Sequence, residues 1–323
     1  MVLAYQIKEP VDSKKLCLKK ISLDEPKADE VRIKNHYVAV NHFDVHHRNG
    51  QYKLSQFPAT LGISGSGEIT KIGNAVKNYK KGDLVSYATN FIGSYAEEIN
   101  IKAQILFSPD KNIPLAAQTA INAPSLLAHA LITNVYSVKK NNNVFITGAT
   151  GGVGNILTQI LTSIGVKVYG IVGQDAKISQ AKAFGCKHVF NYNNKDFYEE
   201  VANATNNQGA SVIYDAIGES FYPKAIKILQ RTGILVNYGD SSGVIKDMRA
   251  MELWQKSLFF VKPHLSIIRG FNLDRIISND YLFTAITKKN ITPHFEIIDF
   301  KNIANAHQRI ENREVIGNIV AKL

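Results

Sequence analysis

Cysteine is scarce in this chain, which has only Cys17 and Cys186 among 323 residues. Two thiols exclude a disulfide framework and a four-cysteine structural zinc site, and they favour a reducing compartment, so we expect a cytoplasmic protein. Long hydrophobic runs are also missing. The best candidate for a membrane span, near Leu115 to Ile132, is interrupted by polar residues and a proline. The N-terminus opens with a strand-like segment and a lysine, which is not the pattern of a signal peptide.

Positive charge is in excess, with 38 basic and 27 acidic residues, a net charge of +11 and a pI of about 9.4. Such a field attracts anionic ligands, including cofactor phosphates. The lysines lie in small scattered groups without interleaved aromatic residues, so we do not expect a nucleic-acid site. The length and the ordinary composition, 45% hydrophobic and 20% charged, suit a globular protein of two domains.

The segment from Val144 to Gly154 is the most informative in the chain. Four β-prone residues run into a loop of glycines and small residues, and a helical pattern then begins at Asn155 and stops at Gly165. A second apolar strand follows from Val166 to Val172. A strand, a glycine turn, a helix and a strand within about thirty residues predict the βαβ unit that binds a dinucleotide.

The glycines of this loop suit the chemistry of a pyrophosphate. Gly151 lets the backbone approach the phosphates, and Gly154 lets the helix pack closely against the strand. The N–H groups at the helix N-terminus then face the negative charge. A glycine-rich turn without a ligand is the alternative reading, since the first glycine of the G-x-G-x-x-G pattern is Ala149 here.

The end of the second strand favours NADP(H) over NAD(H). NAD sites place an acidic residue about 20 residues after the glycine loop to bind the ribose 2′-hydroxyl, whereas this chain has Gly173. Lys177 follows one helical turn later and can meet a 2′-phosphate as a point charge, flanked by Tyr192. Two observations leave the choice open: Asp175 could repel the phosphate or hold the hydroxyl, and Lys177 could be a solvated helix lysine.

The chain divides into a β-rich part and a part in which strands and helices alternate. Residues 1–122 are mostly β-like, with many turn glycines, and indicate a compact barrel-like domain. Residues 123–265 alternate, which predicts a doubly wound parallel sheet of the Rossmann type, with strands expected at 144–147, 166–172, 188–191, 211–217 and 234–238. Residues 266–323 show helical patterns at 279–289 and 301–312 and a terminal strand at 318–323, and we expect them to complete the first domain. The nicotinamide would then lie in a cleft between the domains.

Several motifs together resemble those of the zinc-free quinone oxidoreductases (zeta-crystallin-like) of the medium-chain dehydrogenase/reductase superfamily. Segments 61–69 and 82–85 are similar to its chaperonin-10-like N-terminal fold, and Asn41 to Tyr52 is similar to its N-F-x-D…R-x-G-x-Y cleft motif. Residues 215–218 and 238–243 resemble its D-x-V-G and F-G-N-x-S-G motifs. The resemblance covers nearly the whole chain and implies an α/β fold: a β-rich chaperonin-10-like domain followed by a Rossmann domain.

The resemblance also implies a function, namely a homodimer that uses NADPH to reduce quinones or related α,β-unsaturated carbonyls by hydride transfer. It implies cofactor contacts at Asn41, Gly152, Val153, Gly173, Lys177, Tyr192, Ile217, Gly239 and Ser241, to which the loop chemistry adds Gly151. The Asn41 amide and the Tyr52 hydroxyl are the candidate catalytic groups, because hydrogen-bond donors must polarise the carbonyl where no zinc does. Alternatives are an enone, alkenal or enoyl-thioester reductase on the same fold and, in another class, an RNA-binding zeta-crystallin-like protein.

Three departures from the family pattern concern the substrate rather than the fold. His46 replaces an aromatic residue, Leu127 replaces a threonine of the G-L-T-A helix motif, and residues 317–320 read Gly-Asn-Ile-Val in place of G-K-x-V. A metal is not expected, because zinc relatives use a cysteine where Asn41 falls and a G-H-E segment where residues 62–64 read Gly-Ile-Ser. His42, Asp44 and His46 would be the alternative ligands if they lay on a helix.

Overall fold

The structure is a computed structural model that describes residues 1–89, 92–264, 288 and 291–323. Contacts within the chain divide it into two compact units. The first unit contains Met1–Pro124 and the C-terminal Pro293–Leu323, and the second begins at Ser125. The helical pattern expected at 279–289 and the domain boundary expected at 265/266 fall outside the described residues.

The second unit is built on a six-stranded parallel sheet, as the alternating pattern predicted. Its strands follow the order β10-β9-β8-β11-β12-β13, and each neighbouring pair is parallel. This order reverses between β8 and β11, which is the crevice where doubly wound sheets bind dinucleotides. The bounds are β8 Asn143–Thr147, β9 Lys167–Val172, β10 His188–Asn191, β11 Ala210–Asp215, β12 Leu229–Asn237 and β13 Phe259–Val261.

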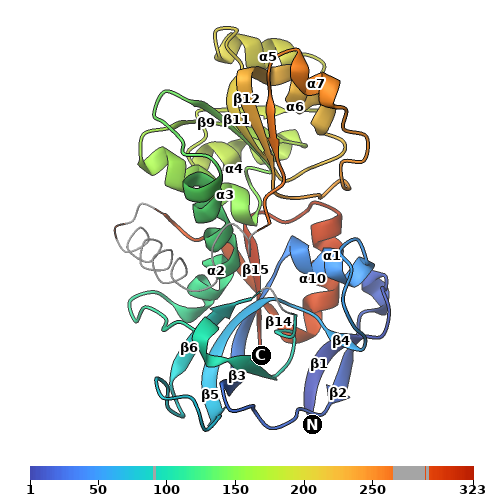
Figure 1. Ribbon diagram of the computed structural model, residues 1–323, viewed down its shortest axis with the longest axis vertical. Coiled ribbons are helices and arrows are strands. Elements are labelled where there is room, and N and C mark those ends of the chain that lie inside the picture. The colour runs from blue at the N-terminus through green and yellow to red at the C-terminus, as the bar shows by residue number, and fades with distance from the viewer. Residues whose placement is uncertain (90–91, 265–287, 289–290) are drawn as a thin grey trace. The chain divides into compact units, whose positions relative to one another are not determined.

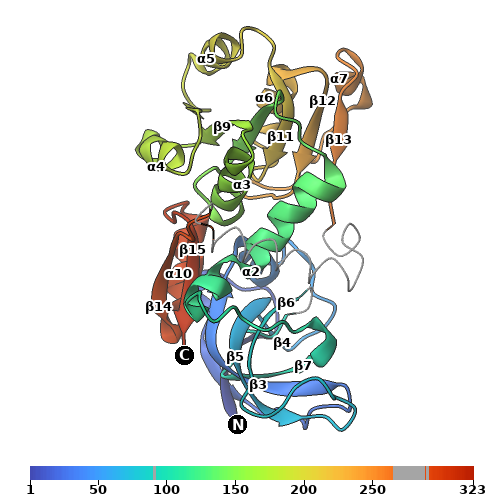
Figure 2. The same cartoon turned by 90° about the vertical axis from the view of Figure 1, so that its left-hand side faces the viewer.

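Strands of this sheet are apolar on both faces because helices cover both. Every residue of β8 and of β11 is buried. Helix α3 contacts β8 and β9 (Figure 2), and one core cluster joins β8 and β11 to α5 and α6 through Phe145, Phe197, Ile213 and Ala225. The helices are α3 Gly152–Ser163, α4 Ile178–Ala183, α5 Phe197–Ala204, α6 Tyr222–Ile228 and α7 Ala250–Trp254.

Helix α3 begins earlier than its hydrophobic pattern indicated. The pattern starts at Asn155, but the helix starts at Gly152, with Gly151 as an extended N-cap. Glycine has a low helix propensity, which hides a first turn made of Gly152, Val153 and Gly154. Strands β8 to β12 were located correctly, with ends that differ from the expected ones by up to five residues.

The first unit is mostly antiparallel β-structure, with its N-terminal strands coloured blue and its C-terminal strands red in Figure 1. Its long central strand β3 (Glu30–Val40) pairs antiparallel with β5, β7 and β15, and a smaller sheet has the order β2-β1-β4. The C-terminal strand β15 therefore adds to a sheet made by the N-terminal residues. The strands are β1 Val2–Ile7, β2 Leu18–Ile21, β4 Ala59–Thr60, β5 Ser64–Ile72, β6 Leu84–Ala88, β7 Glu98–Lys102, β14 Phe295–Asp299 and β15 Asn318–Lys322.

Two helices pack against each other beside this sheet. Helix α1 (His42–Asn49) lies against α10 (Ile303–Glu311), and Val45 and Ile310 belong to one buried cluster. Arg48 on α1 forms an ion pair with Glu311 on α10. The contact fixes α1, and with it the cleft motif predicted from the sequence.

Helix α2 (Leu115–Ala130) contains Pro124, where the first unit ends, and continues as a π-helical turn, Leu131–Val135. The sequence analysis expected no apolar run long enough to span a membrane. The helical segment Leu115–Val135 does meet that test by length and composition. However, 72% of its apolar window is buried inside the structure, which is the position of a core helix.

Candidate active site

The predicted pyrophosphate loop lies at the carboxyl edge of the parallel sheet, between β8 and α3. A Cβ atom added at Gly154 would lie 2.2 Å from the Gly148 carbonyl oxygen, so only glycine permits this close approach of helix and turn. The close contact is with the turn after β8, whereas the packing expected for Gly154 was against the strand itself. The N–H groups of Gly152 and Val153 lie in the first turn, where α-helices leave donors without intrahelical partners.

Gly173 and Tyr192 are in contact at the end of β9. A Cβ at Gly173 would lie 3.3 Å from the Tyr192 ring and hydroxyl, and Tyr192 is 6% exposed. Lys177 closes the short helix Asp175–Lys177 that follows, and its side chain is half-buried. The structure therefore places Tyr192 against Gly173, and recognition of a 2′-phosphate by these two residues and Lys177 stays a prediction.

Asp175, the residue that left the cofactor choice open, is engaged by the protein. Its Oδ1 accepts a hydrogen bond of 2.8 Å from Nδ2 of Asn191, at the end of β10. Asn193 continues the link, donating from Nδ2 to the Gly173 carbonyl at 3.0 Å. This bond occupies one of the acceptor sites of the Asp175 carboxylate.

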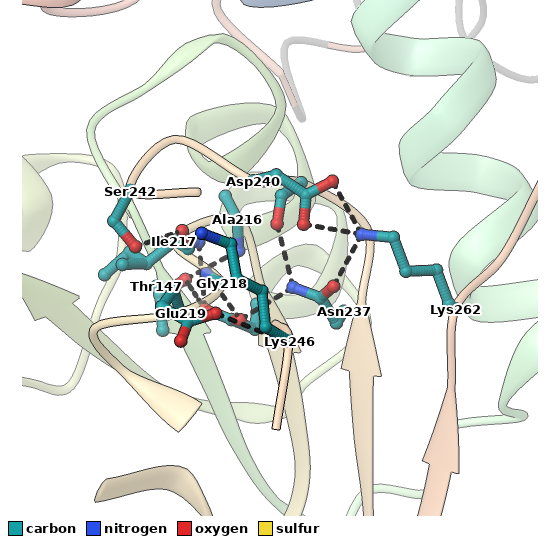
Figure 3. Close-up of polar contacts among 12 residues, drawn as sticks. Thr147, Ala216, Ile217, Gly218, Glu219, Asn237, Asp240, Ser242, Lys246 and Lys262 are labelled. Carbon is teal, nitrogen blue, oxygen red and sulfur yellow. Dashed lines mark hydrogen bonds and ion pairs between the residues drawn. The ribbon is translucent and has the colours of Figure 1, made fainter. Parts of the chain in front are cut away.

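Asp215 ends β11 and is fully buried, two residues before the predicted cofactor residue Ile217. Its carboxylate accepts four hydrogen bonds, from Thr147 Oγ1, the Ile217 and Gly218 N–H groups and Asn237 Nδ2, at 2.8 to 3.0 Å. Burial raises the pKa of this carboxyl, and the four donors oppose that shift. The network orders the turn after β11, where Ile217 lies (Figure 3).

Gly239 and Ser241 lie in the loop that follows β12 and are tied to the β11 turn through their backbones. Gly239 N donates to the Asp215 carbonyl at 3.2 Å, and Ser241 N donates to the Ala216 carbonyl at 3.1 Å. The predicted residues from Gly151 to Ser241 thus share one edge of one sheet. Whether they bind the cofactor stays a prediction.

Asn41 and Tyr52 flank helix α1 in the first unit. Asn41 is the N-cap, and its backbone N–H donates to Asp44 Oδ2 at 2.8 Å. Its Nδ2 donates to Asp44 Oδ2 at 3.3 Å and to Ser64 Oγ at 3.4 Å. The Tyr52 ring packs against His46, with ring centroids 4.8 Å apart, so His46 borders the predicted catalytic tyrosine.

Asp44 is held inside the first unit. Tyr95 donates its hydroxyl proton to Asp44 Oδ2 at 2.9 Å, and Tyr95 also contacts His307 Nε2 at 3.2 Å. Burial raises the pKa of Asp44 to about 7 despite these bonds. His42, Asp44 and His46 do lie on a helix, yet no group of three or more histidine, cysteine or acidic residues is placed to hold a metal in the described part of the chain.

Comparison with known proteins identifies the family. Residues 27–111 match the alcohol dehydrogenase GroES-like domain, and residues 152–264 match the zinc-binding dehydrogenase domain. A quinone oxidoreductase of Salmonella typhimurium is 30% identical over 301 residues, which cover 91% of each chain. This chain belongs to the quinone oxidoreductase family. The family lies within the medium-chain dehydrogenase/reductase superfamily, as the motifs indicated.

Other quinone oxidoreductases share the fold along its full length. The structure of the Escherichia coli quinone oxidoreductase complexed with NADPH matches with a TM-score of 0.96 at 26% identity, covering 99% of this chain and 100% of that one. A 2-haloacrylate reductase of a Burkholderia species is 26% identical over 331 residues, covering 99% of this chain and 98% of its own. The predicted fold class, a GroES-like domain with a Rossmann-type sheet domain, is confirmed.

The sequence analysis missed three polar residues at the carboxyl edge of the parallel sheet, namely Thr147, Asn237 and Lys262. Each lies at or directly after the carboxyl end of a strand, at β8, β12 and β13. That position was the available signal, because carboxyl ends of parallel strands meet at one edge. The motifs had drawn attention to Asp215 without showing what it binds.

Proposed function

We propose that this protein is an NADPH-dependent quinone oxidoreductase that transfers hydride from the nicotinamide to a quinone without a metal. The observation that carries the proposal is the absence of an acidic residue at the end of β9, where Gly173 lies against Tyr192 and Lys177 follows. The relatives named quinone oxidoreductase, one of them crystallised with NADPH, support the same conclusion.

The proposed cofactor path runs along the carboxyl edge of the second unit. Gly151, Gly152 and Val153 would present N–H groups to the pyrophosphate at the start of α3. Gly173, Lys177 and Tyr192 would hold the adenosine 2′-phosphate on the β9 side. Residues on the β11 and β12 side, Ile217, Gly239 and Ser241, would hold the nicotinamide half, because a dinucleotide spans the point where the strand order reverses.

Asn41 and Tyr52 are proposed to orient the cofactor and the substrate. Nδ2 of Asn41 already donates to Asp44 and Ser64, so donation to a substrate oxygen requires one of these long bonds to break. The Tyr52 hydroxyl is the other candidate donor. A quinone accepts hydride readily, so correct placement supplies most of the catalysis and no covalent intermediate is needed. The location of hydride transfer between the two units stays a prediction.

A second substrate class has support from one relative. The 2-haloacrylate reductase is similar over nearly the whole chain, and a haloacrylate is an α,β-unsaturated carboxylate. Reduction of an activated C=C bond uses the same hydride donor but places more charge on the substrate oxygens. We therefore keep enones and related acids as the alternative substrates.

The test is NADPH oxidation against a panel of one benzoquinone, one naphthoquinone, one alkenal and 2-chloroacrylate, with NADH in parallel. We expect the quinones to give the highest kcat/KM, and NADPH to be preferred over NADH. Faster turnover of 2-chloroacrylate or the alkenal would select the alternative class. No oxidation of NADPH with any member of the panel would contradict the proposal.

Zinc independence gives a separate prediction. The chain has Asn41 and Gly62-Ile63-Ser64 where zinc relatives carry ligands, so thorough chelation should leave quinone reduction unchanged. The measurement compares kcat/KM before and after dialysis against a chelator, with total zinc determined on the same sample. Loss of activity that zinc alone restores would show that the protein uses a metal.

A homodimer is proposed from the exposed edge of the parallel sheet. Among the described strands β13 ends the sheet, and Phe259, Met251 and Trp254 around it are 59%, 66% and 72% exposed. Unpaired edges with apolar side chains associate with other strands. We expect Phe259→Glu to shift the molar mass measured by light scattering from dimer to monomer. Tyr198→Glu, at an exposed aromatic residue on α5, should leave the dimer intact; equal masses for all three proteins would refute this edge as the interface.

A further inference from the structure

Polar side chains connect the carboxyl ends of four strands of the second unit. Thr147 ends β8, Asp215 ends β11, Asn237 ends β12, and Lys262 directly follows β13. Hydrogen bonds join these four residues into one network, in which Figure 3 labels Thr147, Asn237 and Lys262. The network of hydrogen bonds extends from the point where the strand order reverses to the last described strand of the sheet.

Lys262 supplies the positive charge of this hydrogen-bonded network. Its Nζ donates to Asn237 Oδ1 at 2.7 Å and to both oxygens of Asp240, at 2.6 and 2.7 Å. Asn237 in turn donates from Nδ2 to Asp215 Oδ2 at 2.9 Å and to the Gly239 carbonyl at 2.8 Å. Lys262 therefore touches the β12 loop directly and the β11 turn through one amide.

The buried carboxylate of Asp240 is stabilised by a positively charged partner. The side chain of Asp240 is 0% exposed, while that of Lys262 is 42% exposed. A buried carboxylate without a counter-charge is strongly unfavourable, and an anionic ligand in the same loop would add repulsion. The aspartate of this chain makes the loop dependent on the lysine.

The loop that Asp240 belongs to is bonded to the β11 turn along its length. Ser242 N and Oγ both donate to the Ile217 carbonyl, at 2.8 and 2.7 Å, and Glu219 N donates to the Gly243 carbonyl at 3.0 Å. A Cβ at Gly218 would lie 2.4 Å from that same Gly243 oxygen, so the two segments are in close contact. Movement of one segment must displace the other.

We propose that Lys262 is a positioning residue for the nicotinamide half of NADPH. By neutralising Asp240 and holding Asn237, it fixes the β12 loop and the β11 turn in the conformation that receives the cofactor. The inference rests on the proposed function, since it assigns Ile217, Gly239 and Ser241 to that half of the cofactor. The adenosine half binds on the other side of the switch point, at Gly173 and Lys177, and does not depend on Lys262.

The experiment measures the dissociation constants of NADPH and of adenosine 2′,5′-bisphosphate, a fragment without the nicotinamide half. Lys262→Met should weaken NADPH binding at least tenfold and leave the fragment within twofold of the unchanged protein. The double variant Asp240→Asn with Lys262→Met should recover most of the NADPH affinity, because the buried charge is removed together with its partner. Lys262→Arg should retain it.

Lys256→Met is the matched control, since Lys256 also makes three hydrogen bonds in the same unit, to the carbonyls of Ile226, Lys227 and Leu229. This variant should lower the melting temperature and change the dissociation constants of NADPH and of the fragment by the same factor. Equal losses of both ligands in Lys262→Met, or no recovery in the double variant, would reduce Lys262 to a stabilising residue and overturn the proposal. Failure of the unchanged protein to bind either ligand would instead overturn the proposed function and this inference with it.

Discussion

Replacing Lys177 by alanine should weaken NADPH binding by about 10- to 150-fold and leave NADH binding nearly unchanged. The side chain would form a charge-assisted contact with the 2′-phosphate, and such contacts contribute about 1.5–3 kcal/mol. NADH has a hydroxyl in place of this phosphate, so it does not make the contact that the substitution removes. The dissociation constants of both cofactors, measured by titration calorimetry, give the two effects separately.

Lys182→Ala is the control for charge, because Lys182 is an exposed lysine on α4 and its loss changes the net charge equally. A long-range effect of charge is screened at physiological salt, so this variant should bind NADPH within about twofold of the unchanged protein. Equal losses of NADPH and NADH in Lys177→Ala would remove Lys177 from the phosphate site. Equal NADPH losses in both lysine variants would attribute the preference to net charge.

Asp44 should make the free energy of unfolding depend on pH. Burial raises the pKa of its carboxyl from 3.8 to about 7 in the folded protein. Below about pH 4 the group is protonated in both states and ionisation costs nothing. As the pH rises from about 4 to about 7, the unfolded chain releases this proton and the folded protein does not. The protein therefore loses stability across this window, by about 4 kcal/mol in total.

The measurement compares the unchanged protein with Asp44→Asn by denaturant unfolding at several pH values. The difference between their free energies of unfolding should shift by about 4 kcal/mol in favour of the asparagine variant between pH 4 and pH 7, with a constant offset for altered hydrogen bonds. Burial lowers the pKa of His42 and His47 to about 4 and that of His307 to about 3, which opposes the trend in both proteins. A difference that does not vary with pH would show that Asp44 ionises without penalty.

Local patterns were sufficient for the parallel sheet and its glycine loop. A short apolar strand, a turn that only small residues permit, and a helix with one apolar face each follow from neighbouring residues. The choice of Gly173, Lys177 and Tyr192 also rested on distance along the chain, and the structure places Tyr192 against Gly173. The first turn of α3 was missed because Gly152 and Gly154 are weak helix formers whose conformation the loop and sheet impose.

The environment of each charged group was decided by tertiary structure alone. Asp44 belongs to a polar segment, yet the folded protein buries it fully and pairs it with Tyr95, which is 51 residues away. Asp240 and Lys262 lie 22 residues apart on different strand ends and meet because the sheet aligns those ends at one edge. The sequence alone determined which segments form strands, helices and the glycine turn, since these depend on neighbouring residues. Ion pairs and buried carboxylates depend on strand order, which brings distant residues into contact.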